Sequence, residues 1–410
     1  MATTSPTTAK PGDRFERLLS TRGRLSRPAG GGGPARGDAK PMYEFAGGRP
    51  DPASFPYAEL VAATAEMMET EGAEALTYGE AQGYPGLRAW VGDLYRWLEG
   101  LEIDPANILI TNGSGQGLAL VLSALVDVGD AVICEAPTFL GTLGAMRRHG
   151  AEIHGVPVDD EGIVTSSVRE RLEALRREGR ACKLIYTMPT FHNPAGVTAT
   201  LARRRELIDL AREYDTLLLE DDAYGALRFA GEQVPSLYAL DGGERVVRSG
   251  TISKVLGAGL RLGWLIAPRE LIPIFQGFNF GGGVNPFVSR VATYYMRENM
   301  VEHIETLRDV YRDKRDAMLR GLREGLDGTE VAISQPEGGF FLWLTLPENV
   351  DPGRVAELAA KAHVHYLPGP AFYPGGEGKE FIRLAYSYES PERCYEGAKA
   401  LGAAIRQACE

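Results

Sequence analysis

Residues 107–125, NILITNGSGQGLALVLSAL, contain a short apolar run, a glycine-rich turn and an apolar stretch with helical spacing. This order predicts a buried strand that leads through a tight turn into a helix. Free N–H groups at the start of such a helix form an anion cradle where glycines allow close approach. The turn lacks the Gly-Lys-Ser/Thr ending of a nucleotide P-loop and departs from the GxGxxG dinucleotide pattern. Taken alone, the motif indicates an anion site or a plain turn equally well.

The same alternation of strand and helix continues along the chain. Short apolar runs at 131–137, 183–189 and 216–222 alternate with helical periodicity at 167–179 and 201–214. Strands that alternate with helices predict βαβ units and a mostly parallel sheet with helices on both faces. The expected fold class is therefore α/β.

Composition divides the chain into three expected parts. Residues 1–40 are rich in Gly, Pro and polar residues, which predicts a flexible tail. Residues 41–288 contain the strand and helix alternation and predict a large domain. A long helical segment from about 288 to 325 follows, and strand-like runs come after it. We expect residues 289–410 to form a smaller α+β domain.

The bulk composition excludes several classes of protein. The chain has 410 residues, of which 44% are apolar, and its net charge is -11. This acidic balance argues against nucleic-acid and acidic-membrane partners. No apolar stretch approaches the roughly 18 residues that span a bilayer. No charged-then-apolar leader opens the chain, so we expect a cytoplasmic protein. The four cysteines are far apart, which fits reduced thiols and predicts no metal site.

Functional groups follow several predicted strands, at the edge where open α/β sheets bind ligands. Phe139 follows the run at 131–137, and an aromatic there is either core or a stacking face for a flat ring. Asn193 follows the run at 183–189 within a Phe-His-Asn-Pro sequence. It is either a turn residue or an amide donor that points into a cleft.

The carboxylates Asp221 and Asp222 end the apolar run at 216–222. Such groups are costly at the end of a buried strand unless they are paired or hydrogen-bonded. Either both carboxylates have a structural role, or Asp221 keeps a proton on the ring nitrogen of a bound ligand. Tyr224 comes three positions after Asp221, so it can reach the opposite side of the same ring.

Lys254 lies within SGTISKVLGAGLRLGW, residues 249–264, among hydroxyls and glycines. It is either a solvated charge or an imine-forming lysine beside an anion site, with Arg261 as a charge clamp. The strand ends together present an anion cradle, an aromatic, an amide, an acid with a tyrosine, a lysine and an arginine. This set is what a flat, phosphorylated, pyridine-like aldehyde requires.

An ordered series of motifs resembles the fold-type-I pyridoxal-phosphate (PLP) enzymes, specifically the class I/II aminotransferases of the 2-aminoadipate and kynurenine-type branch. The resemblance extends from about Phe45 to the C-terminus. It implies a large domain with a mostly parallel seven-stranded sheet between helices, and a smaller α+β domain. It also implies that residues 41–60 form an N-terminal arm that packs with the small domain. The motifs are GGRPDPASFP, LTYGEAQGYPGLR, GSGQGL, EAPTFLG, FHNPAGV, EDDAYGALRF, GTISKVLGAGLRLGW, PEGGFFLWL and FIRLAYS.

The resemblance also implies a role for each matching residue. Lys254 corresponds to the Schiff-base lysine, which also moves protons at Cα. Asp221 corresponds to the partner of the ring nitrogen, and Tyr224 and Asn193 to the pair that binds the phenolate oxygen. Phe139 corresponds to the stacking aromatic. The phosphate cup corresponds to Ser114, Gly115, Gln116, Thr251, Ser253 and Arg261.

Three further residues follow from the same resemblance. Arg383 corresponds to the arginine that binds the substrate α-carboxylate, with Asn193 and Gly48 beside it. Tyr78 corresponds to a tyrosine that reaches the phosphate of the neighbouring subunit. The resemblance thus implies a homodimer with shared active sites.

The expected function is a PLP-dependent aminotransferase that acts at the Cα of an α-amino acid through an external aldimine. The alternative is a non-transaminating PLP reaction of specialised biosynthesis: β/γ-elimination or replacement, decarboxylation or C–C bond formation. Both begin with the same aldimine, so the sequence does not separate them. A sensor domain of a transcription regulator is a third reading, but residues 1–40 cannot form the winged helix it needs.

Three positions depart from the branch pattern. His192 stands where the branch commonly has Gln, and Gly115 stands where it often has Gln. Residues 281–285 are unusually glycine-rich, in a region where family members shape the substrate pocket. The substrate side chain and the role of His192 stay open at the level of sequence.

Overall fold

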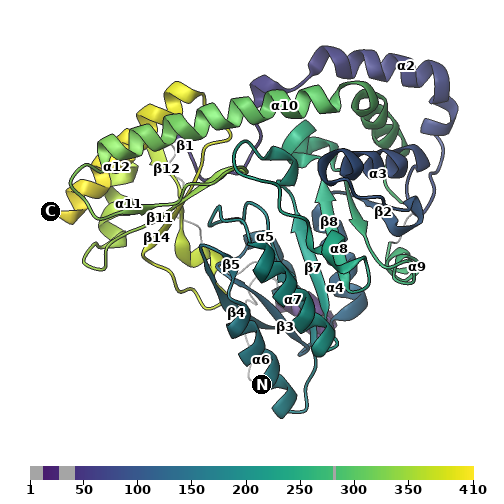
Figure 1. The fold of residues 1–410 in the computed structure, drawn as a ribbon, viewed down its shortest axis with the longest axis horizontal. Helices are drawn as coiled ribbons and strands as arrows, with labels where there is room; N and C mark the ends of the chain where they lie inside the picture. The colour runs from purple at the N-terminus through teal and green to yellow at the C-terminus, as the bar shows by residue number, and fades with distance from the viewer. Residues whose placement is uncertain (1–12, 27–41, 280–282) are drawn as a thin grey trace, which may run out of the picture.

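The computed structural model describes residues 13–26, 42–279 and 283–410. Its largest sheet has eight strands in the order β2-β9-β8-β7-β6-β3-β4-β5 (Figure 1). Neighbouring strands from β4 to β8 in this order run parallel, whereas β9 is antiparallel to both β2 and β8. The strands are β2 Ile108–Thr111, β3 Ala131–Ala136, β4 Glu152–Asp159, β5 Gly162–Ile163, β6 Cys182–Thr187, β7 Leu217–Asp222, β8 Val246–Thr251 and β9 Gly263–Ile266.

The sheet confirms the expected α/β class, with one strand more than the seven expected. The additional strand is the two-residue β5, which pairs antiparallel with the edge strand β4. Central strands are almost wholly buried, as parallel strands covered on both faces must be, and this makes them readable as apolar runs. β4 is largely exposed or half-buried, so it has no such run.

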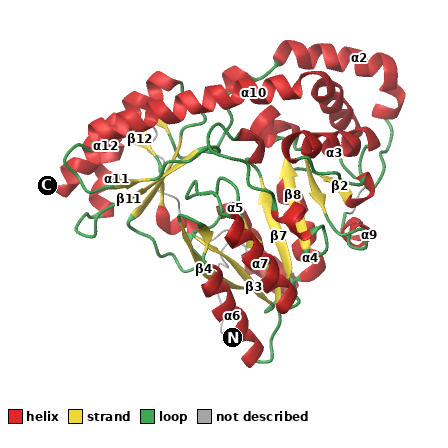
Figure 2. Cartoon of the chain, in the orientation of Figure 1, coloured by secondary structure: helices red, strands yellow, loops and turns green. Residues whose placement is uncertain are grey.

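Helices cover both faces of this sheet (Figure 2). α4 follows β2 directly, and α7 begins at Thr200, whose hydroxyl accepts from the backbone N–H of Arg203. The helices of this part are α2 Tyr57–Ala75, α3 Pro85–Glu99, α4 Ser114–Leu125, α5 Leu140–His149, α6 Thr165–Arg177, α7 Leu201–Glu213, α8 Leu237–Asp241 and α9 Ile272–Gly277.

A second, four-stranded antiparallel sheet lies in the C-terminal part, in the order β10-β11-β14-β13. Its strands are β10 Ala332–Ile333, β11 Phe341–Thr345, β13 Leu367–Pro368 and β14 Phe381–Ala385, and its helices are α11 Pro352–Lys361 and α12 Pro391–Cys409. The architecture of this part agrees with the α+β expectation.

α10, Pro286–Gly325, runs from the large sheet to the small one (Figure 1). It packs along α12, and glycines make the approach close. A Cβ on Gly321 would lie 2.2 Å from the Tyr395 carbonyl oxygen, and one on Gly325 would lie 2.5 Å from that of Lys399. α10 continues across the expected domain boundary at 288/289, so that boundary stays a prediction.

The segment at 13–26 forms a 3-10 helix, Asp13–Leu18, and the short helix α1, Thr21–Leu25. Arg22 donates from Nη2 to the Val126 carbonyl, 3.2 Å away. The rest of the expected tail, residues 1–12 and 27–40, lies outside the described residues. β1, Tyr43–Glu44, pairs parallel with β12, Val364–His365. Within the described ranges, every helix is too short or too polar to cross a bilayer.

Candidate active site

Lys254 lies directly after β8, in a π-helical turn at Ser253–Gly257. Its Nζ donates to the Gly48 carbonyl at 3.0 Å and lies 5.7 Å from the ring centre of Tyr224. The pKa of Lys254 is lowered to about 8, mainly by burial and also by the charge of Arg383, while the charge of Asp221 acts in the opposite direction. This environment yields an amine that readily gives up its proton near neutral pH.

Asp221 is the second-to-last residue of β7, the strand that pairs with β8. It is buried, and its Oδ2 accepts from the hydroxyl of Tyr186 at 2.7 Å. The pKa of Asp221 is raised to about 6, mainly by burial; the hydrogen bond from Tyr186 and the charge of Lys254 lower it, and the charge of Asp222 raises it. A cation placed against Asp221 would therefore stabilise the charged form of this buried carboxyl.

Three side chains meet beyond the strand ends, around Asn193. Arg383 donates from Nη1 to Asn193 Oδ1 at 2.8 Å, and Tyr224 is hydrogen-bonded to Asn193. Tyr224 comes from the turn after β7, and Asn193 from the turn after β6. Burial raises the pKa of Tyr224, so the phenol stays protonated and can donate.

Arg383 projects from β14 of the small sheet and is buried. Its Nη2 donates to the Ala46 carbonyl at 2.5 Å. The guanidinium carbon lies 4.2 Å from the ring centre of Phe341 and 4.9 Å from that of Phe372. Burial lowers the pKa of Arg383 to about 10. An arginine that is buried between two rings and contacts neutral oxygens is well placed to attract an anion.

Gly48 lies against this same group. A Cβ on Gly48 would lie 2.6 Å from Cζ of Phe341, so only glycine fits without a shift of that ring. Its carbonyl accepts from Lys254, as described above. Gly48 therefore contacts the lysine through its backbone and borders the Arg383 site through Phe341.

The expected anion cup assembles around the N-terminus of α4. Arg261 donates from Nη2 to the Asn112 carbonyl at 3.2 Å, and its guanidinium would lie 3.0 Å from a Cβ on Gly113. Thr251 Oγ1 and Ser253 Oγ are 2.8 Å apart at the end of β8. α4 begins at Ser114, so the backbone N–H groups of its first turn lie at this end of the helix. The cup thus combines helix N–H groups, hydroxyls and a guanidinium.

Gln116 and Gly115 shape the floor of this cup. Gln116 Oε1 accepts from the Asn112 N–H at 2.6 Å, and its Nε2 donates to Asn279 Oδ1 at 3.1 Å. A Cβ on Gly115 would meet no described atom within 4 Å. The glycine therefore leaves room in the cup where a side chain would fit.

The buried polar atoms fit a phosphorylated pyridine aldehyde. Among the described residues, Asp221 Oδ1 and Arg383 Nε are buried without a hydrogen-bond partner. Such atoms are rare in folded proteins and call for a partner. A protonated ring nitrogen suits the first and a carboxylate suits the second. Lys254 and the cup then face the positions of an aldehyde and a phosphate.

Two expected residues stand apart from this group. Tyr78 is 95% exposed and borders a pocket of about 220 Å³ with Glu74, Val284 and Arg290. Phe139 is half-buried at the residue before α5, with its ring against Gly141. The contacts among the described residues do not test whether Tyr78 or Phe139 belongs to the site.

The sequence interpretation missed Tyr186 and left His192 open. Tyr186 looked like a core residue of β6, and only the adjacency of β6 and β7 reveals its bond to Asp221. His192 Nδ1 accepts from the Ala195 N–H at 3.2 Å, and Nε2 lies 3.2 Å from Glu135 Oε2 without the alignment of a hydrogen bond. Both ring nitrogens thus face the protein and support the turn of Asn193.

Comparisons with known proteins agree with this geometry. The family model for aminotransferase class I and II matches residues 47–401. Aromatic-amino-acid aminotransferase 1 of Thermococcus litoralis is 37% identical over 370 residues, which cover 89% of this chain and 88% of that protein. The 2-aminoadipate transaminase of Thermus thermophilus is 34% identical over 370 residues, covering 89% and 90%. The crystal structure of Pyrococcus horikoshii kynurenine aminotransferase in complex with PMP has a TM-score of 0.85 at 35% identity, covering 91% of this chain and 92% of that chain.

Proposed function

The chain belongs to the aminotransferase class I and II family of PLP-dependent transferases, and on this premise we propose which of its residues perform the transfer. The cofactor is pyridoxal 5'-phosphate and the substrates are amino acids. The observation that carries the proposal is the half-buried amine of Lys254, which lies near Tyr224 and the Gly48 carbonyl, in the turn after the strand that pairs with the strand of Asp221.

The residues around Lys254 hold the cofactor in this proposal. Asp221 keeps a proton on the ring nitrogen, and Asn193 and Tyr224 donate to the phenolate oxygen. Phe139 stacks on the ring. The phosphate binds in the cup of Ser114, Gly115, Gln116, Thr251, Ser253 and Arg261. When bound, PLP supplies the carbonyl that takes up the amino group and the electron sink that weakens the Cα–H bond.

Lys254 serves as the proton-transfer group. With a pKa near 8, about a tenth of the Nζ amine is unprotonated at pH 7 and about half at pH 8. Nζ would take a proton from the substrate Cα and would return it to the carbon that the cofactor supplies as its aldehyde. Burial excludes water, which would otherwise compete for the same proton.

Arg383 binds the α-carboxylate of the substrate, with Asn193 and Gly48 beside it. The free Nε of Arg383 and its position between two aromatic rings support this role. Phe340 lies 5.9 Å from Lys254 Nζ, measured to its ring centre, and packs on Tyr311. These apolar rings, and relatives named for aromatic amino acids, kynurenine and 2-aminoadipate, favour an aromatic or long side chain on the substrate.

We also propose a cytoplasmic homodimer with shared active sites and no nucleic-acid or membrane partner. Tyr78 is nearly fully exposed, and three large apolar side chains of α2 and of the residue after it are also exposed: Tyr57, Val61 and Leu76. A second copy that covers this surface brings Tyr78 to the phosphate cup of its partner. The domains proposed are 41–288, with residues 41–60 as an arm, and 289–410.

The test is a half-reaction without any 2-oxo acid. Purified holoenzyme is titrated with a panel of α-amino acids while its absorbance spectrum is recorded. We expect at least one amino acid to convert the cofactor stoichiometrically to its amine form, and a 2-oxo acid to reverse the change. Product formation with a cofactor that never becomes the amine form would reject transamination and favour elimination, decarboxylation or C–C bond chemistry.

A further inference from the structure

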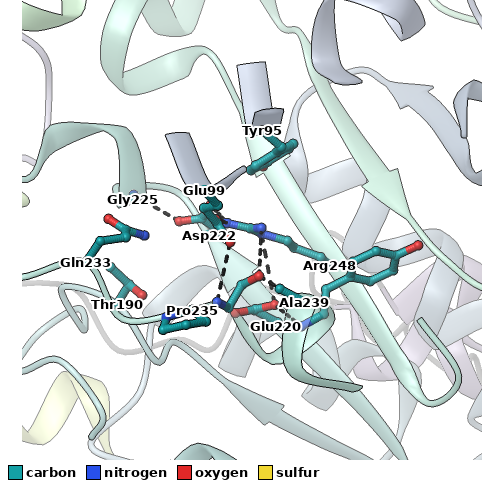
Figure 3. Close-up of polar contacts among 12 residues, drawn as sticks. Tyr95, Glu99, Thr190, Glu220, Asp222, Gly225, Gln233, Pro235, Ala239 and Arg248 are labelled. Atoms are coloured by element: carbon teal, nitrogen blue, oxygen red, sulfur yellow. Dashed lines mark hydrogen bonds and ion pairs between the residues drawn. The ribbon is translucent and has the colours of Figure 1, made fainter. Parts of the chain in front are cut away.

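A buried charge cluster lies behind the strand end that carries Asp221. Side chains alternate along β7, so Glu220 and Asp222 face the side of the sheet opposite to Asp221. Arg248 on β8 reaches into this cluster, and its side chain is 3% exposed (Figure 3). Its Nη2 donates to Asp222 at 2.6 Å and to Glu99 at 2.5 Å.

Asp222 links Arg248 to the turn that carries Tyr224 through its two carboxylate oxygens. Its Oδ2 accepts from Arg248, and its Oδ1 accepts from the Gly225 N–H at 2.9 Å. A Cβ on Gly225 would lie 2.4 Å from Oδ1, so the close approach depends on glycine. Arg248 therefore fixes one carboxylate whose other oxygen fixes the backbone beside Tyr224.

A second buried arginine, Arg204 on α7, fixes the turn that carries Asn193. It is 1% exposed and contacts neutral oxygens. Nη2 donates to the Pro189 carbonyl at 2.7 Å and to Thr190 Oγ1 at 2.9 Å, and Nε donates to the Ala199 carbonyl at 3.1 Å. These acceptors lie on both sides of Asn193, at the start and the end of its loop.

The turn at Pro235 and Ser236 connects the two arginines. Arg204 Nη1 donates to the Pro235 carbonyl at 3.1 Å. Arg248 Nη1 donates to Ser236 Oγ, also at 3.1 Å. Figure 3 shows Pro235 next to the charged group around Arg248. The loop of Asn193 and the turn of Tyr224 are thereby held from behind by one connected set of contacts.

The acids of this set outnumber its cations, so the loss of either arginine would leave still more buried negative charge without compensation. Glu99, Glu220 and Asp222 are buried acids, and Arg204 and Arg248 are the cations among them. Removing one cation leaves buried carboxylates without compensation, which costs far more than a surface ion pair is worth. The cluster is thus stiff, because any displacement of one member exposes the charge of another.

We propose that Arg204 and Arg248 are positioning residues that together fix Asn193 and Tyr224 relative to each other. The inference rests on the proposed function, in which these two residues hold the phenolate oxygen of the cofactor. Neither arginine contacts the reacting atoms. Their effect reaches the site through the backbone of the 189–199 loop and of the 222–225 turn.

Arg204→Lys tests the proposal, because lysine keeps the charge but its single ammonium group cannot donate to all the oxygens that the guanidinium of Arg204 binds. We expect the apo protein to bind PLP about tenfold more weakly, the cost of losing hydrogen bonds made by a charged group. Donors favour an ionised oxygen, so a looser Asn193–Tyr224 pair raises the pH at which the cofactor's visible band titrates. Both readouts are made without an amino acid, so they do not depend on whether transamination itself occurs.

Two controls separate positioning from loss of stability. Arg205→Lys changes an exposed arginine on the same helix and should leave PLP affinity and the titration midpoint unchanged. Leu172→Ala truncates a core residue of α6 that makes none of the hydrogen bonds of Arg204 or Arg248, so it lowers stability without removing any of them. Its thermal midpoint should fall while its spectrum stays that of the wild type.

The proposal is overturned if Arg204→Lys behaves like Leu172→Ala, with a lower thermal midpoint but wild-type PLP affinity and wild-type titration. If Arg204→Lys does not fold, Thr190→Val decides instead. It removes one acceptor of Arg204 and keeps the shape of the side chain. A weaker PLP affinity and a raised pH midpoint of the visible band in Thr190→Val support the positioning role of Arg204, and wild-type values overturn it.

Discussion

Lys254 Nζ donates a hydrogen bond to the carbonyl of Gly48, 3.0 Å away and 206 positions earlier in the chain. The contact joins the turn after β8 to the segment whose Ala46 carbonyl accepts from Arg383. The amine proposed to move protons and the guanidinium proposed to bind the substrate carboxylate are therefore hydrogen-bonded to one short stretch of backbone. That arrangement restrains the position of the Lys254 amine relative to the Arg383 guanidinium.

In the proposed function Lys254 is both the cofactor attachment and the base, so Lys254→Ala should remove both. We expect the visible absorbance band of the bound cofactor to be lost and the transfer rate to fall by at least about 10³-fold, as for loss of a positioned base. Lys183→Ala, which changes an exposed lysine on β6, is the matched control and should keep both. A visible band that persists in Lys254→Ala would remove Lys254 from the site.

Asp221→Asn gives a stability prediction for the apo protein. Burial raises the pKa of Asp221 from 3.8 to about 6, so the folded state binds this proton more tightly than the unfolded state. The wild type therefore loses stability as pH rises from about 4 to 6, by up to about 3 kcal/mol. Asparagine does not ionise, so the variant should lack this loss.

Denaturant unfolding of the two apo proteins between pH 4 and pH 8 measures the difference. We expect the unfolding free energy of Asp221→Asn to rise relative to that of the wild type as pH rises, with the full difference reached above about pH 7. Parallel profiles would mean that Asp221 is not a strained buried acid. Bound cofactor should reverse the order, because the ring nitrogen then compensates the wild-type carboxylate.

Arg383→Lys should raise the KM for the amino acid substrate by about 10- to 100-fold, because a point charge replaces a planar fork. The rate at saturating substrate should fall less than kcat/KM. Steady-state kinetics with one good substrate from the panel measures the split, and Arg406→Lys on the exposed face of α12 serves as control. An unchanged KM would place the α-carboxylate elsewhere.

Tyr78→Ala should weaken cofactor binding only if Tyr78 reaches the site of a second copy. Mixing Tyr78→Ala with Lys254→Ala tests this, since each protein alone lacks one required residue. A mixed dimer contains one intact site, so random exchange should restore about a quarter of the wild-type activity. No recovery in a sample shown by sedimentation to contain exchanged dimers would contradict a shared site.

The strand ends were predictable from sequence because buried parallel strands are continuous apolar runs, and the residue after such a run lies at the binding edge. This logic placed Lys254, Asp221 and Asn193 at one edge of the sheet before any coordinates. The cup around Ser114 followed from glycines before a helix. The hydrogen bond from Gln116 to Asn279 was not predictable from the same pattern, because the two residues lie 163 positions apart.

The missed features depend on strand order and on burial of charge. The bond from Tyr186 to Asp221 requires β6 beside β7, which periodicity does not specify. Arg204 sits in the charged-looking helix sequence LARRRELIDLAREY, where its neighbours Arg203 and Arg205 are more exposed. Nothing in that local pattern distinguishes the one arginine that turns inward. β4 was missed because its side chains are mostly not buried.

The most direct test of the account is the fate of the substrate amino group in a single turnover. Holoenzyme is mixed with one equivalent of a ¹⁵N-labelled α-amino acid without any 2-oxo acid, and the released cofactor is analysed by mass spectrometry. The account predicts that the cofactor carries the ¹⁵N label as its amine form, matched by an equal amount of the 2-oxo acid. An unlabelled aldehyde cofactor together with labelled ammonia, or with a decarboxylated amine, would contradict it.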